Sequence, residues 1–114
     1  MHELSYMIKL ADLAIKEAKK NNASSVREIT VEAGELTGVL PEYLSYYFPQ
    51  VAKGTILEGA KLTAIKVPVT AKCNDCGNIY NPDKDNNYSC PVCKSINAAI
   101  TGGRDVVLTG VVID

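Results

Sequence analysis

Hydrophobic and polar residues follow two different periods along this chain, and these periods predict two helices and three strands. Residues 4–20 place apolar side chains three or four positions apart, which is the spacing of a helix with one buried face. Glu3 at the start of this segment and the lysines at its end suit the helix dipole. The predicted apolar stripe consists of Leu4, Met7, Ile8, Ala11, Ala14, Ile15 and Ala18.

The segment from Val26 to Ala33 changes to strict alternation, which predicts a strand with Ile29, Val31 and Ala33 on its covered face. Gly34 ends this strand. Pro41 begins a second helix, because the first helical position needs no backbone N–H. Pro49 predicts either a kink in that helix or its end near Phe48. The apolar side of the second helix consists of Tyr43, Leu44, Tyr47 and Phe48.

Two further strands are predicted on either side of a polar segment that contains every cysteine. One spans residues 65–71 and runs directly into Cys73, and the other spans residues 107–113. The polar unit is therefore inserted between two strands that can pair with each other. The alternating positions are Ile65, Val67, Val69 and Ala71 in one strand and Val107, Thr109, Val111 and Ile113 in the other.

These elements predict an α+β fold: a small three-stranded sheet with two helices, plus a zinc-ribbon-like four-cysteine unit inserted between strands. The predicted domains are residues 1–71 with 103–114, which form an α/β body, and residues 72–102, which form a metal-binding unit. The ends of this unit, at Lys72 and near Gly102, are expected to act as hinges.

The four cysteines form two Cys-x-x-Cys pairs, Cys73–Cys76 and Cys90–Cys93, separated by thirteen residues. Two intervening residues allow a tight turn to bring both sulfurs of a pair to one point, and two such turns complete a tetrahedron. Gly77 frees the backbone after the first pair, and Pro91 stiffens the turn of the second. The pattern predicts a structural Zn(II) site closed by four thiolates, with no open position for catalysis.

The cysteines also allow other interpretations. Two disulfides would need an oxidising compartment, whereas the chain shows no signal peptide, so we expect a cytoplasmic protein with reduced thiols. A thioredoxin-like redox pair uses one motif after a strand in a βαβ unit, which two matched pairs do not resemble. Iron bound to four sulfurs stays open, because Cys-x-x-Cys-Gly and Cys-Pro-x-Cys are also similar to the turns of rubredoxin.

The length and composition of the chain exclude several classes of function. The 114 residues can bury one compact core and not two large ones. Twelve basic and thirteen acidic residues are interspersed and leave a net charge of −1, which provides no basic patch for nucleic acid. No apolar run approaches the length of a membrane span. No nucleophile–base pair, phosphate loop or paired catalytic carboxylates can be identified, so we expect a protein that is not an enzyme.

His2 is the only histidine, and it follows directly after Met1. The α-amine, the amide nitrogen of residue 2 and the imidazole can chelate one divalent ion, and one more amide nitrogen would complete a square. Four nitrogens in this geometry suit Ni(II) or Cu(II). Taken alone, the residue is better explained as an incidental imidazole at a chain terminus.

Several segments together resemble the hydrogenase nickel-incorporation family of the HypA/HybF type. The segments are Met1-His2-Glu3-Leu4, Ala33-Gly34-Glu35-Leu36, Glu58-Gly59-Ala60, the paired cysteine motifs and the closing strand after Gly103. This resemblance covers nearly the whole chain and implies a Ni(II)-binding metallochaperone for the maturation of nickel–iron hydrogenase, and also of urease. It implies a nickel site built from His2, the Met1 amine and nearby backbone nitrogens, with Glu3 close to it. A separate Zn(II) would be held by Cys73, Cys76, Cys90 and Cys93.

The resemblance also implies partners: a nickel-handling GTPase of hydrogenase maturation and the precursor of the hydrogenase large subunit. Neither nucleic acid nor a membrane is expected to bind, and a homodimer is left open. Two alternatives follow from the cysteines if His2 plays no role. One is a rubredoxin-like electron-transfer module with iron, and the other is a zinc-ribbon adaptor that binds only proteins.

Overall fold

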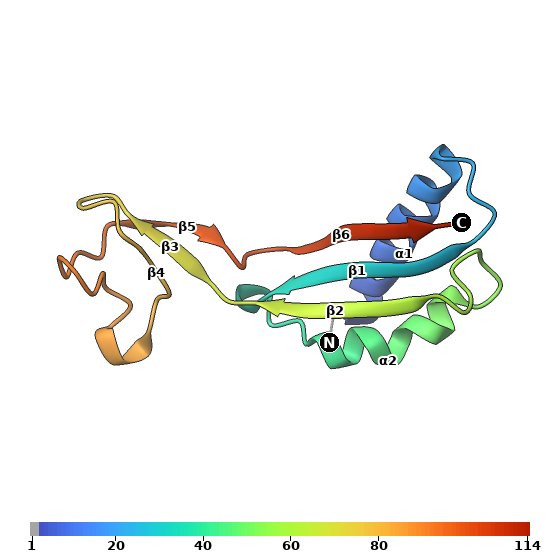
Figure 1. Cartoon of the computed structure of the whole chain (residues 1–114). Coiled ribbons are helices and arrows are strands. Elements are labelled where there is room, and N and C mark those ends of the chain that lie inside the picture. The colour runs from blue at the N-terminus through green and yellow to red at the C-terminus, as the bar shows by residue number, and fades with distance from the viewer. Residues whose placement is uncertain (1–2) are drawn as a thin grey trace.

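Two small three-stranded sheets, joined end to end, make up the computed structural model of this chain, which describes residues 3–114 (Figure 1). The first sheet carries both helices, and the second carries the cysteine-containing turns. The predicted α+β class, with two helices and a four-cysteine unit between strands, is confirmed. The elements of the first part are α1 (Glu3–Lys20), β1 (Val26–Gly34), the short 3-10 helix η1 (Glu35–Thr37), α2 (Pro41–Ala52), β2 (Lys61–Val67) and β6 (Val106–Ile113).

Strand β1 is the centre of the first sheet, with β2 parallel on one side and β6 antiparallel on the other. Helix α2 makes the crossover between the parallel strands, as parallel pairing requires. Both helices cover the same face (Figure 1). The prediction that the strands flanking the cysteine unit pair with each other is wrong, because β1 lies between them and leaves each at an edge.

The core lies between the helices and the covered face of β1. Ile29, Val31 and Ala33 are fully buried, so the predicted alternation is confirmed. The predicted stripe of α1 is wrong at two positions, since Leu4 is 42% and Ile8 is 53% exposed. The buried apolar residues of the helix are instead Met7, Leu10, Ala11, Ala14 and Ala18.

Helix α2 continues through Pro49 to Ala52, so the predicted alternative of an end near Phe48 is wrong. Leu44, Phe48 and Ala52 are buried four residues apart on one side. Their burial holds the helix together although Pro49 cannot donate the backbone hydrogen bond that the carbonyl of Ser45 would accept.

The predicted strand over residues 65–71 is two strands of different sheets. β2 ends at Val67 and the next strand begins at Thr70, because Pro68 cannot donate to a ladder and breaks the pairing between them. The predicted facing is also wrong, since Ile65 is 45% exposed. Leu62 and Ala64 pack against the core instead.

Strand β6 contains a bulge at Thr109. Thr30 pairs with Gly110 and Val31 pairs with Leu108, so Thr109 has no opposite residue in β1. The bulge reverses the side-chain phase along the strand, which places Leu108 and Val111 on the core side. The prediction that Val107 shares a face with Val111 is therefore wrong, and Val107 is 42% exposed.

The second sheet is antiparallel and has β3 at its centre, between β4 and β5. Four buried residues form a separate small core: Ala71, Cys73, Tyr80 and Cys90. Two of these four are cysteines, so apolar side chains alone provide little burial here. The elements are β3 (Thr70–Cys73), β4 (Ile79–Tyr80), the 3-10 helix η2 (Lys84–Asn86) and β5 (Ala98–Gly102).

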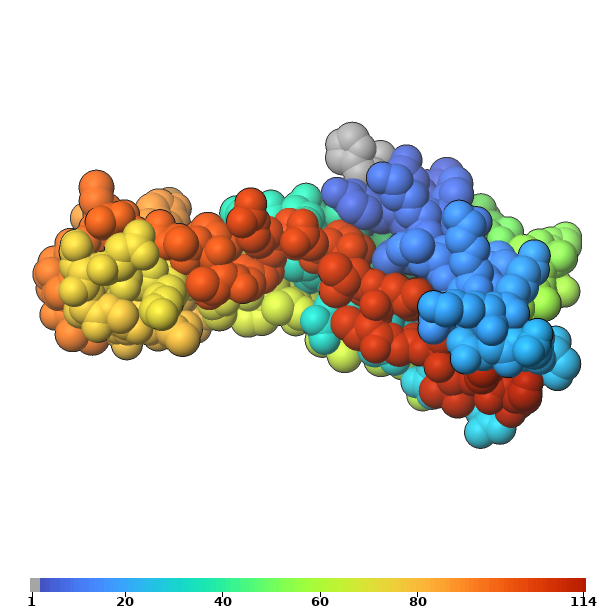
Figure 2. Space-filling model, turned by 90° about the horizontal axis from the view of Figure 1, so that it is seen from above, coloured from blue at the N-terminus to red at the C-terminus, as the bar shows by residue number. Residues whose placement is uncertain are grey.

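Two connections join the parts, one through Pro68 and one through Gly103, and the molecule is elongated, at 53 × 28 × 16 Å (Figure 2). Its radius of gyration is 17.4 Å, whereas a compact domain of about 100 residues has about 13 Å. The division into domains at residues 71–72 and 102–103 stays a prediction. Neither helix within residues 3–114 has the length and apolar character needed to cross a membrane.

Candidate metal centre

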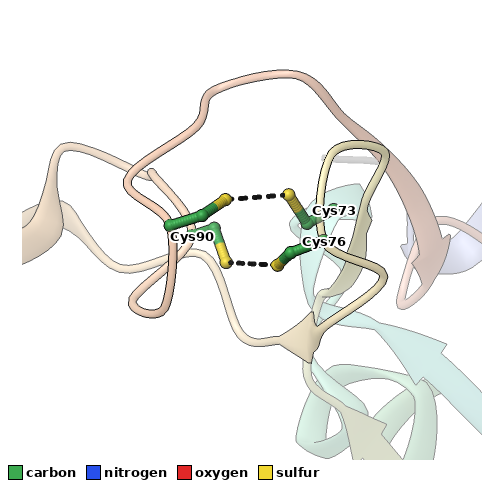
Figure 3. A group of neighbouring side chains, drawn as sticks. Cys73, Cys76 and Cys90 are labelled. Carbon is green, nitrogen blue, oxygen red and sulfur yellow. Dashed lines mark hydrogen bonds between the residues drawn. The ribbon is translucent and has the colours of Figure 1, made fainter.

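The four cysteine sulfurs converge at the outer end of the second sheet (Figure 3). All four Sγ atoms lie within 4.8 Å of one another. The Sγ atoms of Cys73 and Cys93 are 3.4 Å apart, and those of Cys76 and Cys90 are 3.6 Å apart. Four sulfurs around zinc are about 3.8 Å apart when each Zn–S bond is about 2.3 Å. The cluster therefore has the size of a four-thiolate metal site.

The two cysteine turns have the same backbone structure. In the first, the N–H of Gly77 donates to the carbonyl of Cys73 at 2.9 Å, and the N–H of Cys73 donates to the carbonyl of Asn78 at 2.8 Å. In the second, the N–H of Lys94 donates to the carbonyl of Cys90 at 2.8 Å, and the N–H of Cys90 donates to the carbonyl of Ser95 at 2.9 Å. Each turn thus presents its two sulfurs from one rigid loop.

Gly77 and Lys94 occupy equivalent positions in these turns, and both have positive φ, 78° and 65°. Glycine takes this conformation at little cost, which explains Gly77. Lysine does not, so the second turn holds a strained residue directly after its second cysteine. The sequence showed the role of Gly77, whereas the matching role of Lys94 is visible only in the structure.

Backbone N–H groups point at the sulfurs and change their acidity. Burial raises the pKa of Cys90, but the N–H groups of Cys93 and Val92 outweigh it and lower that pKa to about 6. The N–H of Cys76 is the largest influence on Cys73 and lowers its pKa. The buried sulfur of each turn is thereby prepared to be a thiolate, the form that binds metal.

The exposed thiols of Cys76 and Cys93 hold their protons more tightly than the two buried thiols do. The N–H of Ser95 lowers the pKa of Cys93, but the adjacent sulfur of Cys73 and then burial raise it to about 12 overall. The N–H of Asn78 likewise lowers the pKa of Cys76, whereas burial and the sulfur of Cys90 raise it, and the overall shift is upward. Each close sulfur pair therefore combines one acidic and one weakly acidic thiol. A metal ion must displace protons to bind all four.

Polar contacts outside the cluster hold the two turns together. Asn78, which belongs to the first turn, donates from Nδ2 to the Sγ of Cys90 at 3.7 Å. Asn74 donates through its backbone N–H to the carbonyl of Asn97 at 2.8 Å and through its side chain to the Oδ1 of Asn97 at 3.1 Å. Ser95 also donates to the carboxylate of Asp75. Sequence reasoning did not identify these residues, because their partners are distant in the chain.

The candidate nickel residues belong to the other part of the molecule. Met1 and His2 lie outside the described residues. Glu3 begins α1, is only 6% exposed, and its Oε2 accepts a hydrogen bond from the N–H of Leu40 at 3.4 Å. Leu40 is the residue that precedes α2. The carboxylate of Glu3 is thus directed at the start of α2, where the positive ends of both helices favour a negative charge.

Comparison with known proteins assigns the family. The model of a family described as hydrogenase/urease nickel incorporation, metallochaperone, HypA matches residues 1–113. This chain belongs to the HypA family. Hydrogenase maturation factor HypA from Picosynechococcus is 38% identical over 108 residues, which covers 95% of each chain. HypA from Methanocella arvoryzae is 40% identical over 111 residues, with 95% of this chain and 94% of that protein covered.

Solved structures of the family have the same fold. The solution structure of the nickel metallochaperone HypA from Helicobacter pylori superposes with a TM-score of 0.71 at 25% identity, covering 99% of this chain and 97% of that one. A second solution structure of a HypA protein gives a TM-score of 0.75 at 26% identity, with 99% and 96% covered. Both helices, both sheets and the cysteine turns of this chain therefore form a known HypA arrangement.

Proposed function

We propose that this chain is a nickel metallochaperone that binds Ni(II) at its N-terminus and delivers it during the maturation of nickel–iron hydrogenase. The observation that carries the proposal is the match of the HypA family model to residues 1–113, which include His2. The proposed nickel ligands are the imidazole of His2, the amine of Met1 and nearby backbone nitrogens, a donor set that suits Ni(II). The protein itself acts as a carrier and not as an enzyme.

We further propose that the cysteine cluster holds a structural Zn(II). Its support is the size of the cluster, 4.8 Å across at most, and the four sulfur donors that zinc prefers in closed sites. A closed set of four thiolates leaves no position for substrate, so zinc would stabilise the second sheet and nickel would bind elsewhere. Cys73, Cys76, Cys90 and Cys93 are the proposed ligands.

The proposed partners are those that the delivery of nickel requires. They are a nickel-handling GTPase of hydrogenase maturation, and the precursor of the hydrogenase large subunit as the receiver. The proposed location is the cytoplasm, where these thiols would stay reduced. Delivery to urease is part of the same proposal, since the description of the family names both enzymes.

Nickel titration of untagged protein tests the proposal, because a tag ahead of Met1 would remove the free amine. Isothermal titration should show one tightly bound Ni(II) per chain, and His2→Ala should abolish this binding. Affinity should fall as the pH drops from about 8 to 6, since the amine and the imidazole, with ordinary pKa values near 8 and 6.5, must lose protons to bind.

Elemental analysis of the same samples provides the control. His2→Ala should still contain one zinc per chain, because the imidazole is not part of the cysteine cluster. Iron in place of zinc would support the electron-transfer alternative instead. Equal Ni(II) affinity in His2→Ala and the parent protein would contradict the proposed nickel site.

A further inference from the structure

The segment Gly34–Leu36 lies where the two connections between the sheets meet, and it belongs to neither proposed metal site. The first connection runs through Pro68 and Val69 from β2 to β3, and the second runs through Gly103 from β5 to β6. Figure 1 shows the short helix η1 beside the point at which β2 passes into β3. The hydrogen bonds of this segment therefore bear on how the second sheet is attached to the first.

Both polar groups of the Val69 backbone are held by side chains. Its N–H donates to Oε1 of Glu35 at 3.1 Å, and its carbonyl accepts from Nδ2 of Asn81 at 2.9 Å. Glu35 belongs to η1 of the first part, whereas Asn81 follows β4 of the second part. One peptide of Val69 is thus held by each part, and the φ and ψ angles of this residue lie between the two held peptides. Val69 is the pivot of the first connection.

Gly103 is the corresponding pivot of the second connection. Its carbonyl accepts from the N–H of Leu36 at 2.9 Å, which holds the following peptide to the first part. The preceding residue, Gly102, pairs with Thr70 of β3 and so belongs to the second sheet. Gly103 has a φ of 75°, a conformation that glycine takes at little cost. The neighbouring residues Glu35 and Leu36 therefore hold the first-part side of both pivots.

The two connections are packed against each other and against the end of β1. A Cβ atom at Gly103 would lie 2.6 Å from the carbonyl oxygen of Pro68, so these two backbones are in direct contact. Gly34 of β1 also lies directly against Gly103, and its N–H donates to the carbonyl of Asp105 at 2.9 Å. Close packing of this kind blocks sliding of one backbone past another. The second sheet can therefore change its position chiefly by rotation at Val69 and Gly103.

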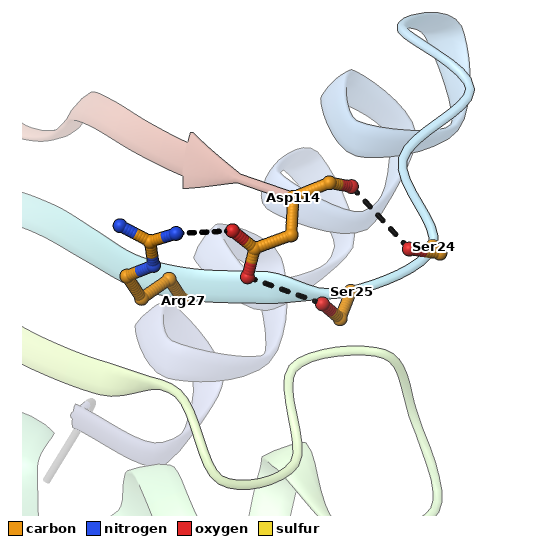
Figure 4. A network of polar contacts seen from close by, with 4 residues as sticks. All are labelled: Ser24, Ser25, Arg27 and Asp114. Atoms are coloured by element: carbon orange, nitrogen blue, oxygen red, sulfur yellow. Dashed lines mark hydrogen bonds and ion pairs between the residues drawn. The ribbon is translucent and has the colours of Figure 1, made fainter.

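The far end of β6 is anchored as well, which keeps the second connection from shifting along the sheet (Figure 4). Asp114 forms an ion pair with Arg27, and its carboxylate accepts from the hydroxyl of Ser25 at 3.4 Å. The carbonyl of Asp114 accepts from the N–H of Ser24 at 3.2 Å, and its own N–H donates to the carbonyl of Ser25 at 3.0 Å. β6 is thus held beside the start of β1 here and at the end of β1 through Asp105.

We propose that Glu35 is a positioning residue, which sets the orientation of the cysteine-containing sheet on the part of the chain that carries the proposed nickel ligands. Without its bond to Val69, the ψ angle of Pro68 also becomes free, because the proline ring fixes φ alone. The joint is then longer and looser. The consequence for nickel delivery rests on the proposed function: a partner that contacts both sheets meets one fixed arrangement of their surfaces.

Residual dipolar couplings of the backbone amides in zinc-containing protein test the proposal, because they report the orientation of each sheet in a common frame. In the parent chain, the couplings of both sheets should fit a single alignment tensor. In Glu35→Ala, the couplings of the second sheet should become at least about twofold smaller than those of the first, since this sheet then samples several orientations. Two separate tensors in the parent would overturn the proposal, and so would a single tensor in Glu35→Ala.

Glu35→Gln separates the hydrogen bond from the charge, since glutamine keeps an acceptor oxygen at the same place in the side chain, and it should keep the single tensor. Glu58→Ala is the matched control, because Glu58 is also an exposed carboxylate of the first part but precedes β2, at the other end of that strand from Val69. It should leave the orientation unchanged. Loss of the single tensor in Glu35→Gln or in Glu58→Ala would mean that charge, and not the bond to Val69, orients the second sheet, which would contradict the proposal.

Amide hydrogen exchange gives a second, local measurement. The N–H of Val69 should exchange at least about tenfold faster in Glu35→Ala than in the parent, because its acceptor has been removed. The amides of β1 should keep the rates of the parent, which shows that the first sheet stays folded. Unchanged exchange at Val69 in Glu35→Ala would overturn the proposed bond.

Nickel titration and elemental analysis of the same variants separate this inference from the proposed function. Glu35→Ala should bind one Ni(II) and contain one zinc per chain, as the parent does, because Glu35 is a ligand in neither proposed site. Absence of Ni(II) binding in the parent and the variant alike would contradict the proposed function and would leave the orienting role of Glu35 standing. A single tensor in Glu35→Ala with normal nickel binding would have the opposite meaning.

Discussion

Lys94 and Gly77 show how one residue changes the energy of a metal site. Their turns share the same hydrogen bonds and the same positive φ, yet only Gly77 takes this conformation without strain. Left-handed backbone costs a residue with a side chain about 1–2 kcal/mol. The second cysteine turn therefore stores strain that zinc binding must overcome when it orders this segment.

Removing that strain should tighten zinc binding. We expect Lys94→Gly to raise zinc affinity about fivefold, which corresponds to about 1 kcal/mol of relieved strain. Competition with a chromophoric chelator measures the change. Lys94→Ala is the control, because it removes the same charge and keeps the side-chain clash. An equal gain in both variants would show that charge, and not backbone conformation, is responsible.

Glu3 is buried where two helices begin, and it is the one charged residue buried among residues 3–114. Its Oε2 accepts from the N–H of Leu40, which has no side-chain cap of its own. His2 directly precedes Glu3 in the sequence, so the held carboxylate is next in the chain to the proposed nickel ligands. The structure therefore supports an anchoring role for this carboxylate.

Two substitutions separate anchoring from nickel ligation. Glu3→Ala removes the acceptor for Leu40 and should lower the free energy of unfolding by about 1–2 kcal/mol. Glu3→Gln keeps a carbonyl oxygen there and should cost less in urea denaturation. Glu3→Gln should also keep one-to-one Ni(II) binding. Complete loss of nickel in Glu3→Gln, as expected for His2→Ala, would instead make Glu3 a ligand.

At the level of secondary structure, the sequence predicted each long helix and the central strand, because their periods extend over many residues. The covered face of β1 followed from this pattern, and the start of α2 followed from Pro41. The facing of β6 did not, since the bulge at Thr109 reverses which side chains are buried, and the division of β2 from β3 at Pro68 was not predicted either. Such shifts depend on tertiary pairing and leave no periodic signal.

The candidate site likewise has some features that could be predicted from the sequence and others that could not. The four sulfurs could be predicted from spacing alone, because each pair of ligands lies within one turn. The contacts of Asn78 and Asn97 join segments distant in the chain and could not be predicted. The burial of Glu3 against Leu40 could not be predicted either, because it depends on how the two helices meet.

The backbone of β1 at Gly34 lies very close to the backbone of the connection that runs through Gly103. A Cβ atom at Gly34 would lie 2.4 Å from the carbonyl oxygen of Gly103. Gly34→Ala should therefore push the two backbones apart and destabilise the protein by about 1–3 kcal/mol. Chemical denaturation of dilute protein measures this change.

Gly110→Ala is the matched control for Gly34→Ala. Its added Cβ would lie 3.7 Å from Thr30, an ordinary contact, and its backbone needs no positive φ. This variant should keep the stability of the parent within about 1 kcal/mol. Similar losses in both variants would show that the close approach at Gly34 is not the cause.

At the scale of the molecule, the part with the first sheet and the part with the second sheet are held in their folds by different interactions. The first part buries fourteen residues in a continuous core, whereas the second buries four, of which two are proposed zinc ligands. Zinc bound by such sites contributes on the order of 10–16 kcal/mol of binding free energy. The second sheet should therefore be ordered by its metal, and the first by apolar burial.

Cys73→Ser tests this dependence on metal most directly, because serine has nearly the same size and only the ligand is lost. Zinc should disappear, and the amide resonances of β3, β4 and β5 should collapse toward unfolded positions. Those of α1, α2 and β1 should stay dispersed. Ala71→Ser is the matched control, since Ala71 is equally buried beside the cluster but is not a ligand. It should keep one zinc per chain and an ordered second sheet. Collapse of the first sheet in Cys73→Ser would instead mean that both sheets fold as one unit, which would leave the proposed division of the chain without support.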